Sequence, residues 1–382
     1  MTSITLIGTV RTRTAGETWA AIRPELDRLG ISRVARLTGL DHLDIPVWTA
    51  VRPHARTLVT SQGEGATDTL AKISAVLESA ELWHAEQPLE ADVRTSHRRL
   101  RVPYPLTALP TKADDAALTA VPLDWVAARG LIGDDDIPLP ADVVRRQQHR
   151  DGQPEIFHVT SNGLACGNTL TEATLHGLLE VVERDVLHVD HMTGGQGRTI
   201  LLPGTVTDPY CRDLVARFVR AGMWLEMAWV SNVYGVPVCA AYIWCEDYPI
   251  VFAGSGCHYD PRIALARALT EAAQSRLTCI AGTRDDLASH EHAFGRSDPA
   301  RPILADLPTA DWADLTHTRF PDHDDLGAHL ESIAGRVAAA SGYEPVAFTL
   351  HDSEAYAAVK VVSPGLEMRV IRSIPCPGGR RA

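Results

Sequence analysis

The 382-residue sequence is short of lysine and lacks the patterns that mark several common protein classes. Only three of its 36 basic residues are lysines, no run of Lys or Arg exceeds two residues, and acidic residues number 48. The resulting net charge of −12 argues against a basic protein that binds nucleic acid through its phosphates. The sequence also has no apolar run of about 18 residues, so it predicts no membrane-spanning helix.

Cysteine and targeting patterns are equally sparse. The seven cysteines are scattered and form no CxxC pair, which argues against a zinc ribbon, a thioredoxin-like site and a disulfide framework. The first eight residues lack the basic region and apolar stretch of a signal peptide. We therefore expect a cytoplasmic protein with reduced cysteines.

The common nucleotide and hydrolase signatures are missing as well. No Lys follows a Gly, which excludes a P-loop. Gly254-Ser255-Gly256 begins a GxG, but the third glycine of a dinucleotide-binding fingerprint does not follow. Neither HExxH nor GxSxG occurs. An enzyme with this sequence would need an uncommon scaffold or an uncommon site.

What the sequence does contain is the composition of a globular protein, 45% hydrophobic and 22% charged. Hydrophobic periodicity predicts a mixture of helices and strands without a strict βαβ rhythm, which indicates an α/β or α+β fold with mixed sheets packed against helices. We expect one domain over residues 1–382, with loop-rich stretches near 90–152 and 298–325 and a short helix near 123–129. The predicted helices are 67–86, 169–190, 208–221, 260–280 and 326–340; the predicted strands are 33–37, 46–51, 58–61, 156–160, 224–230, 236–244, 345–350 and 357–362.

The predicted helix 169–190 carries an unusual set of carboxylates. On a helical wheel Glu172 lies at 0°, Glu183 at about 20° and Glu180 at about 80°, so the three share one arc beside the apolar face. Like charges on one arc repel each other, and a divalent cation would relieve that repulsion. Asn168 adds a neutral oxygen ligand one turn earlier, and Arg184 follows.

Two other predicted helices repeat this pattern. Helix 67–86 places Glu78 and Glu81 one turn apart, with Ser74 on the same side. Helix 260–280 groups Arg267, Glu271 and Gln274 on one face, whereas Arg276 points the opposite way. Together these side chains suit an anionic ligand bridged by Mg²⁺, with carboxylates on the metal and guanidiniums on phosphates. That the three helices meet is a hypothesis at this point.

Simpler interpretations of the same residues remain open. An ExxE pair is common on a solvated helix face, and Arg267 with Glu271 is also an ordinary i,i+4 salt bridge. An unrelated metal-dependent hydrolase would need His or Asp ligands at close spacing. His84 and His176 lie on or beside the acidic helices, and we interpret them as structural.

Taken in order, several segments resemble the YcaO family over nearly the whole chain. The most specific is Glu172 followed by EVVERD at 180–185. The other resembling segments are GISRVARLTG at 30–39, PVW at 46–48, SQGEG at 61–65, SAVLESAE at 74–81, SNGLA at 161–165, RALTEAAQSR at 267–276 and PGLE at 364–367.

The resemblance implies an ATP-binding fold without a P-loop, in which acidic helices hold Mg²⁺ and the triphosphate. It assigns Glu78, Glu81, Glu180 and Glu183 to Mg²⁺. It assigns the following residues to ATP: Arg11, Thr18, Ser74, Asn168, Glu172, Arg184, Arg267, Glu271 and Gln274. One departure is clear, because many members read Gly-Lys-Gly where this chain has Gly63-Glu64-Gly65, which puts a phosphate or substrate contact there in doubt.

Members of the family activate a peptide backbone amide by ATP-dependent O-phosphorylation, so the resemblance implies a cyclodehydratase that forms an azoline or an amidine. Thioamide formation is the first alternative, because segments 8–11 and 282–286 resemble stand-alone and thioamide-forming members. The segment Pro375-Cys376-Pro377 is also only a truncated form of the alternating prolines of azoline-forming relatives, which weakens the azoline interpretation. A non-catalytic peptide- or nucleotide-binding scaffold is the second. The expected partners are a ribosomally made precursor peptide, a leader-binding or sulfur-delivery protein and a second copy of the chain, with no nucleic acid and no membrane.

Overall fold

The computed structural model describes residues 3–112, 116–146, 155–284, 286–287, 290–294, 301–304, 306–316, 320, 323 and 325–367. Its strands form a six-stranded sheet (order β6-β7-β15-β16-β9, with β8 paired to β7), a five-stranded sheet (β13-β12-β11-β10-β14), a three-stranded sheet (β3-β4-β5) and the hairpin β1-β2. All pairings are antiparallel except β10 with β14. The mixed fold predicted from the sequence is confirmed.

The helices are α1 (Ala15–Ile22), α2 (Asp68–Ala85), α3 (Ala141–Val144), α4 (Leu170–Met192), α5 (Pro209–Arg220), α6 (Pro261–Ala281), α7 (Glu291–Phe294), α8 (Trp312–Thr316) and α9 (Leu326–Ser341). The strands are β1 (Ile4–Leu6), β2 (Thr9–Arg11), β3 (Arg33–Arg36), β4 (Val47–Val51), β5 (Thr60–Glu64), β6 (Val93–Ser96), β7 (Pro122–Gly130), β8 (Asp136–Pro140), β9 (Leu164–Gly167), β10 (Arg198–Leu201), β11 (Trp224–Val230), β12 (Val238–Cys245), β13 (Tyr248–Cys257), β14 (Thr309–Ala310), β15 (Val346–Asp352) and β16 (Ala357–Val362).

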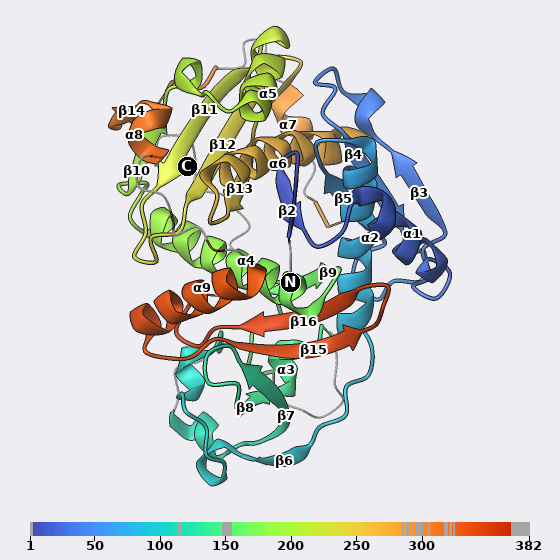
Figure 1. The fold of residues 1–382 in the computed structure, drawn as a ribbon, viewed down its shortest axis with the longest axis vertical. Helices are drawn as coiled ribbons and strands as arrows, with labels where there is room; N and C mark the ends of the chain where they lie inside the picture. Colours follow the sequence, from blue (N-terminus) through green and yellow to red (C-terminus); the bar gives the residue numbers. More distant parts are fainter. Residues whose placement is uncertain are drawn as a thin grey trace.

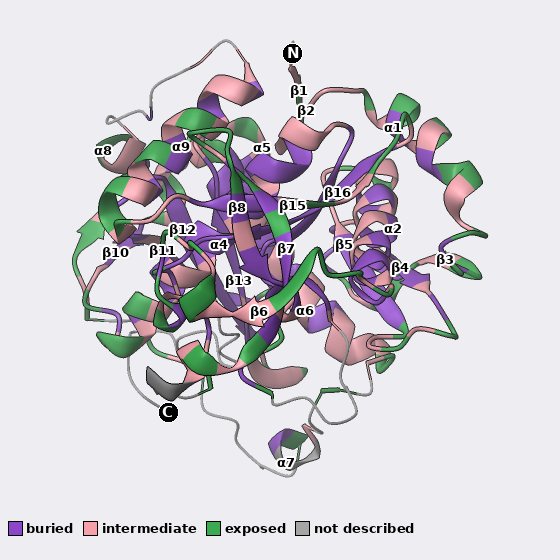
Figure 2. Ribbon diagram, turned by 90° about the horizontal axis from the view of Figure 1, so that it is seen from below, coloured by how far each residue is buried: buried purple, intermediate pink, exposed green. Residues whose placement is uncertain are grey.

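Helix α4 runs through the middle of the molecule, between the five-stranded sheet and the six-stranded sheet (Figure 1). It packs on β9 and β16 on one side and reaches β13 on the other, while α2 packs on β4, β5 and β9 and α6 packs on β12 and β13. Buried residues concentrate around α4 and the strands beside it, and the exposed residues lie on the outer segments (Figure 2). The three helices that carry the acidic residues therefore converge on the core.

The long helices begin at side-chain caps that the sequence supplies. Thr67 accepts a hydrogen bond from Leu70 N at the start of α2, and Thr169 accepts one from Glu172 N at the start of α4. Asp260 caps α6, with Pro261 at the first helical position. Because these caps satisfy amide groups that have no partner within the helix, they fix where each helix starts and which side chains face inward.

Several sequence predictions need correction. The helix predicted near 123–129 is strand β7, a nine-residue strand that pairs with β6 and β8 and buries Trp125 and Val126. Its short apolar run fits the periodicity of a helix as well as that of a strand, and the pairing with neighbouring strands decides between them. The strand predicted at 156–160 is only an isolated bridge between Thr111 and Phe157. The stretch 90–152, expected to be loop-rich, contributes β6, β7, β8 and α3. The expected proline pattern at 375–377 lies outside the described residues.

Candidate active site

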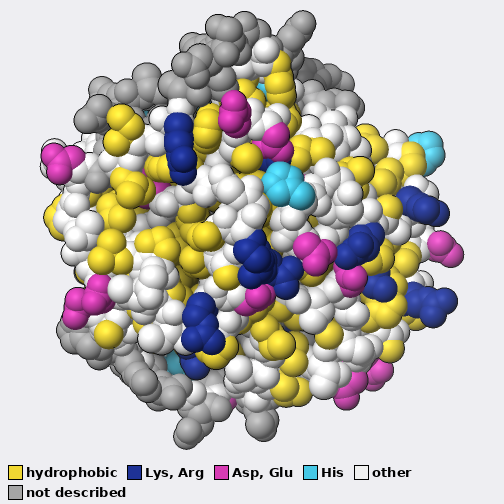
Figure 3. Space-filling view, turned by 90° about the horizontal axis from the view of Figure 1, so that it is seen from above, with side chains coloured by type: hydrophobic (Ala, Val, Ile, Leu, Met, Phe, Trp, Pro, Cys, Tyr) yellow, Lys and Arg dark blue, Asp and Glu magenta, His cyan; other side chains and the backbone are white. Residues whose placement is uncertain are grey.

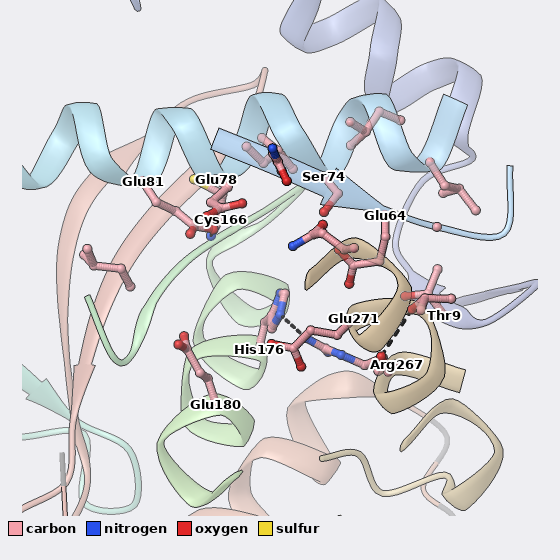
Figure 4. Close-up of a pocket in the computed structure, with 18 of the residues that line it drawn as sticks. Thr9, Glu64, Ser74, Glu78, Glu81, Cys166, His176, Glu180, Arg267 and Glu271 are labelled. Atoms are coloured by element: carbon pink, nitrogen blue, oxygen red, sulfur yellow. Dashed lines mark hydrogen bonds between the residues drawn. The ribbon is translucent and has the colours of Figure 1, made fainter. Parts of the chain in front are cut away.

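A cavity of about 880 Å³ lies between α2, α4, α6, β5 and the hairpin β1-β2. All thirteen residues proposed from the sequence line it: Arg11, Thr18, Ser74, Glu78, Glu81, Asn168, Glu172, Glu180, Glu183, Arg184, Arg267, Glu271 and Gln274. Figure 4 shows the acidic side chains of α2, α4, α6 and β5 directed into one shared space. The convergence on which the sequence hypothesis depended is thus present in the structure.

One end of the cavity is closed by a network that ties the N-terminal segment to the start of α4. The carboxylate of Glu172 accepts hydrogen bonds from Thr12 N at 2.8 Å and Thr12 Oγ1 at 2.7 Å, and from Asn168 Nδ2 at 3.1 Å. Thr18 Oγ1 donates to Asn168 Oδ1 at 2.8 Å, and Arg11 Nε lies 3.7 Å from Glu172 Oε1. Glu172 therefore has several partners within the protein, and its contacts organise this end of the cavity.

Glu81 and Glu180 face the cavity from α2 and α4, and each accepts a backbone hydrogen bond. Cys166 N donates to Glu81 Oε1 at 2.7 Å, and Gly163 N donates to Glu180 Oε2 at 3.3 Å. Gly163 has φ +80°, and a Cβ there would lie 2.1 Å from Val361 O, so the turn requires glycine. Burial raises the pKa of Glu81 well above its usual value, and the charges of Glu180 and Glu78 raise it further.

Glu183 and Glu271 meet at a serine that the sequence analysis did not select. Ser255 Oγ lies 2.7 Å from Glu183 Oε1 and 3.2 Å from Glu271 Oε2, and Ser255 N donates to the same Glu271 oxygen at 2.7 Å. A Cβ on Gly254 would lie 2.2 Å from Ala272 N. The GxG that fails as a dinucleotide fingerprint therefore allows β13 to pack closely on α6, with Ser255 between the two carboxylates.

Glu64 was left out of the sequence assignment because it replaces a basic residue, yet it also lines the cavity. Burial raises the pKa of Glu64 to about 7, with Glu271 contributing. Burial likewise raises the pKa of Glu78 to about 8, with Glu64 contributing. Glu64, which stands where many family members have a basic residue, therefore adds a carboxyl group to the acidic wall.

The basic side chains lie among these carboxylates. Arg184 is 3.8 Å from Glu180 and 3.7 Å from Glu183, and Arg267 is 2.9 Å from His176 Nε2. Burial holds the pKa of His176 well below its usual value, and Arg267 and Arg11 lower it further, so the neutral ring accepts the hydrogen bond from Arg267. His84 contacts the Tyr356 hydroxyl at 2.9 Å and does not line the cavity. Arg276 bonds to Asp41 and Asp247, and this matches the orientation predicted from the helical wheel.

Comparison with known proteins places this geometry in a family. The chain matches the family model described as YcaO cyclodehydratase, ATP- and Mg²⁺-binding, over residues 62–367. The chain belongs to the YcaO family. An uncharacterised protein of Mycobacterium tuberculosis is 36% identical over 366 residues, which cover 94% of this chain and 83% of that protein.

Solved structures of a YcaO protein and of a heterocyclase share the fold. The structure of YcaO from Methanopyrus kandleri bound with AMPPCP and Mg²⁺ has a TM-score of 0.72 at 22% identity and covers 96% of both chains. A heterocyclase in complex with substrate and cofactor has a TM-score of 0.74 at 20% identity, covering 94% of this chain and 53% of that chain. The cofactors of this YcaO protein are ATP and Mg²⁺. The prediction of one domain over residues 1–382 stays a prediction.

The cavity fits those cofactors chemically. Carboxylate oxygens are the ligands that Mg²⁺ prefers, and the raised pKa values of Glu64, Glu78 and Glu81 indicate more buried negative charge than the protein itself neutralises. Gln274 Oε1 is buried and has no hydrogen-bond partner within the described part of the chain. That oxygen is placed to accept a hydrogen bond from a bound ligand.

Two of the site's residues gave no usable signal in the sequence. Thr12 and Ser255 are single hydroxyl residues in short segments, and their roles follow from contacts across 160 and 72 residues of sequence.

Among the described residues, no helix is long and apolar enough to cross a membrane.

Proposed function

We propose that this YcaO protein uses ATP to phosphorylate the oxygen of a backbone amide in a ribosomally made peptide, and that the product is a cyclodehydrated one, an azoline or an amidine. The observation that carries the proposal is the single cavity in which carboxylates from α2, α4, α6 and β5 meet arginines from β2, α4 and α6. Because ATP is needed, we place the reaction in the cytoplasm.

In this proposal Mg²⁺ is held by Glu78 and Glu81 of α2 and Glu180 and Glu183 of α4, all of which line the cavity. Bound there, the metal would neutralise the charge of the triphosphate. The remaining residues of the site would bind the nucleotide: Arg184 and Arg267 the phosphates, with Arg11, Thr18, Ser74, Asn168, Glu172, Glu271 and Gln274 around them.

The role of the protein in the reaction is positioning. An amide oxygen is a poor leaving group, and after a nucleophile adds to the amide carbon, the oxygen can accept a phosphoryl group and depart as phosphate. The cavity would hold the acceptor oxygen in line with the nucleotide and keep water away, since its carboxylates are largely desolvated. A Cys, Ser or Thr side chain of the substrate as nucleophile gives an azoline, and an amine gives an amidine.

Thioamide formation is a second candidate, in which sulfide from a delivery partner is the nucleophile. Two segments that resemble stand-alone and thioamide-forming members contribute to the lining of the cavity, one with Gly8, Thr9 and Arg11 and the other with Arg284 and Asp286. Both candidates use the same phosphorylated amide and differ only in the nucleophile.

The test incubates the purified full-length protein and MgATP with synthetic peptides encoded beside its gene, with and without co-expressed neighbouring proteins. Phosphate release with loss of one water from the peptide supports cyclodehydration, and exchange of one oxygen for sulfur supports thioamidation. Peptide binding without phosphate release or a change in peptide mass would contradict both candidate reactions and support a non-catalytic scaffold. Glu331→Gln, an exposed change on α9 outside the cavity, is the control that should behave as wild type.

A further inference from the structure

Near Glu78 the cavity is lined by two arginines. Arg146, which follows α3, and Arg284, which follows α6, lie there together with Asp286, and we call them the basic end. The backbone N–H of Arg146 donates to Ala85 O at the end of α2, at 2.8 Å, one helical turn after Glu81. The basic end therefore adjoins the acidic centre directly.

Of these two arginines, only Arg284 forms an ion pair with a carboxylate among the described residues. Arg284 donates to both oxygens of Asp286 at 2.7 Å, whereas no carboxylate within the described residues forms an ion pair with Arg146. Burial lowers the pKa of Arg146, and Arg284 lowers it further, against opposing effects of Glu86, Asp286 and Glu78. Glu86 is itself held by Arg52 at 2.8 Å. A partly desolvated guanidinium is stabilised when an anion pairs with it directly, and among the described residues no carboxylate does so for Arg146.

The position of this pair separates it from the nucleotide residues. Ala281 lies fourteen positions after Arg267 on α6, which is about 21 Å of helix, and Arg284 lies further along the chain. The charge of Arg284 nevertheless lowers the pKa of Glu78. The basic pair is thus separated from Arg267 along α6 and lies close to Glu78, a carboxylate proposed to hold Mg²⁺, so a group bound there would lie beside the proposed site of phosphoryl transfer.

We propose that Arg146 and Arg284 form a subsite for a carboxylate of the peptide substrate, either an acidic side chain or the C-terminal carboxylate near the activated amide. This inference rests on the proposed function. Leu58, Leu82 and Leu287 also line the cavity and would contact apolar parts of the peptide. On the face shown in Figure 3, basic and acidic side chains are intermixed, so selection of an acidic peptide would come from this local pair and not from a broad basic surface there.

The test uses an equimolar library of synthetic octapeptides in which Asp and Glu are matched with Asn and Gln, each made as free acid and as C-terminal amide. The full-length protein is incubated with the library, Mg²⁺ and AMPPCP, and retained peptides are quantified by mass spectrometry. We expect acidic peptides to be retained about tenfold or more over their amide counterparts, as for a charge-assisted hydrogen bond. Loss of the preference on C-terminal amidation alone identifies the terminal carboxylate as the source.

The variant Arg146→Gln should abolish this preference, Arg146→Lys should keep part of it, and Arg129→Gln, an exposed change outside the cavity, should leave it intact. Equal retention of acidic and neutral peptides by the wild type, or an unchanged preference in both Arg146 variants, would overturn the proposal. So would weaker AMPPCP binding in Arg146→Gln by calorimetry, because the anion would then be the triphosphate. Acidic peptide retention by a protein that fails to bind AMPPCP would support the subsite and contradict the proposed function instead.

Discussion

Binding of Mg²⁺ and nucleotide should release protons from the carboxylates of the cavity. In the free protein burial raises the pKa of Glu64 to about 7 and that of Glu78 to about 8, and it also raises the pKa of Glu81, Glu180 and Glu271. A bound cation favours the ionised form of each group, so the protons must leave as the complex forms.

The size of the effect follows from those two values. At pH 7 a group with a pKa of about 8 is about nine-tenths protonated and one with a pKa of about 7 is about half protonated, so Glu78 and Glu64 alone release about one and a half protons. The release should shrink as the pH rises above about 8. The same pKa values predict how the stability of the free protein changes with pH. Between pH about 5 and 8 the folded protein binds more protons than the unfolded chain, so its free energy of unfolding falls as the pH rises through that window.

Calorimetric titration with MgAMPPCP in buffers of different ionisation enthalpy measures this release. Glu78→Gln should remove about one proton and Glu64→Gln about half a proton at pH 7, whereas Glu331→Gln on the surface should remove none. Proton uptake on binding, or a release that both cavity variants leave unchanged, would refute the reasoning.

Three further outcomes test separate parts of the account. Glu183→Gln should reduce phosphate release about a hundredfold or more with an unchanged melting temperature, and near-normal turnover would contradict its assignment. Gly254→Ala should destabilise the fold by about 1–3 kcal/mol or more, because the added Cβ would collide with Ala272 N. Gly335→Ala, where a Cβ would have no neighbour within 4 Å, should stabilise α9 by up to about 1 kcal/mol. Denaturant midpoints in the reverse order would refute the packing argument. Asp190→Asn should cost about 1–3 kcal/mol in chemical denaturation because it removes the negative charge that lies 2.7 Å from the buried Arg198 guanidinium, and a cost below about 0.5 kcal/mol would count against that role.

The sequence predicted the elements that carry the site because each long helix buries one face and exposes another. Periodicity placed α2, α4 and α6 within one or two residues of their observed ends, and the helical wheel put Glu180 and Glu183 beside the buried face. It could not show that the helices meet, since that depends on the sheets between them. The family resemblance supplied what periodicity lacked.

The failures have identifiable physical causes. Strand β7 was taken for a helix because its short apolar run fits both periods until its neighbours on each edge are known. Strand β13 was missed because two of its last residues are glycines, which are poor strand formers but are required by the close packing on α6. Glu64 was set aside because the family pattern led us to expect a cation there, and only the surrounding carboxylates reveal its environment.

The most direct test of the central claim follows the amide oxygen itself. A precursor peptide with heavy oxygen in its backbone carbonyls is incubated with the protein and MgATP, and the released phosphate is analysed by mass spectrometry. The account predicts that the label moves from the peptide into phosphate, one atom for each modified amide. A modified peptide accompanied by unlabelled phosphate would contradict phosphorylation of the amide oxygen.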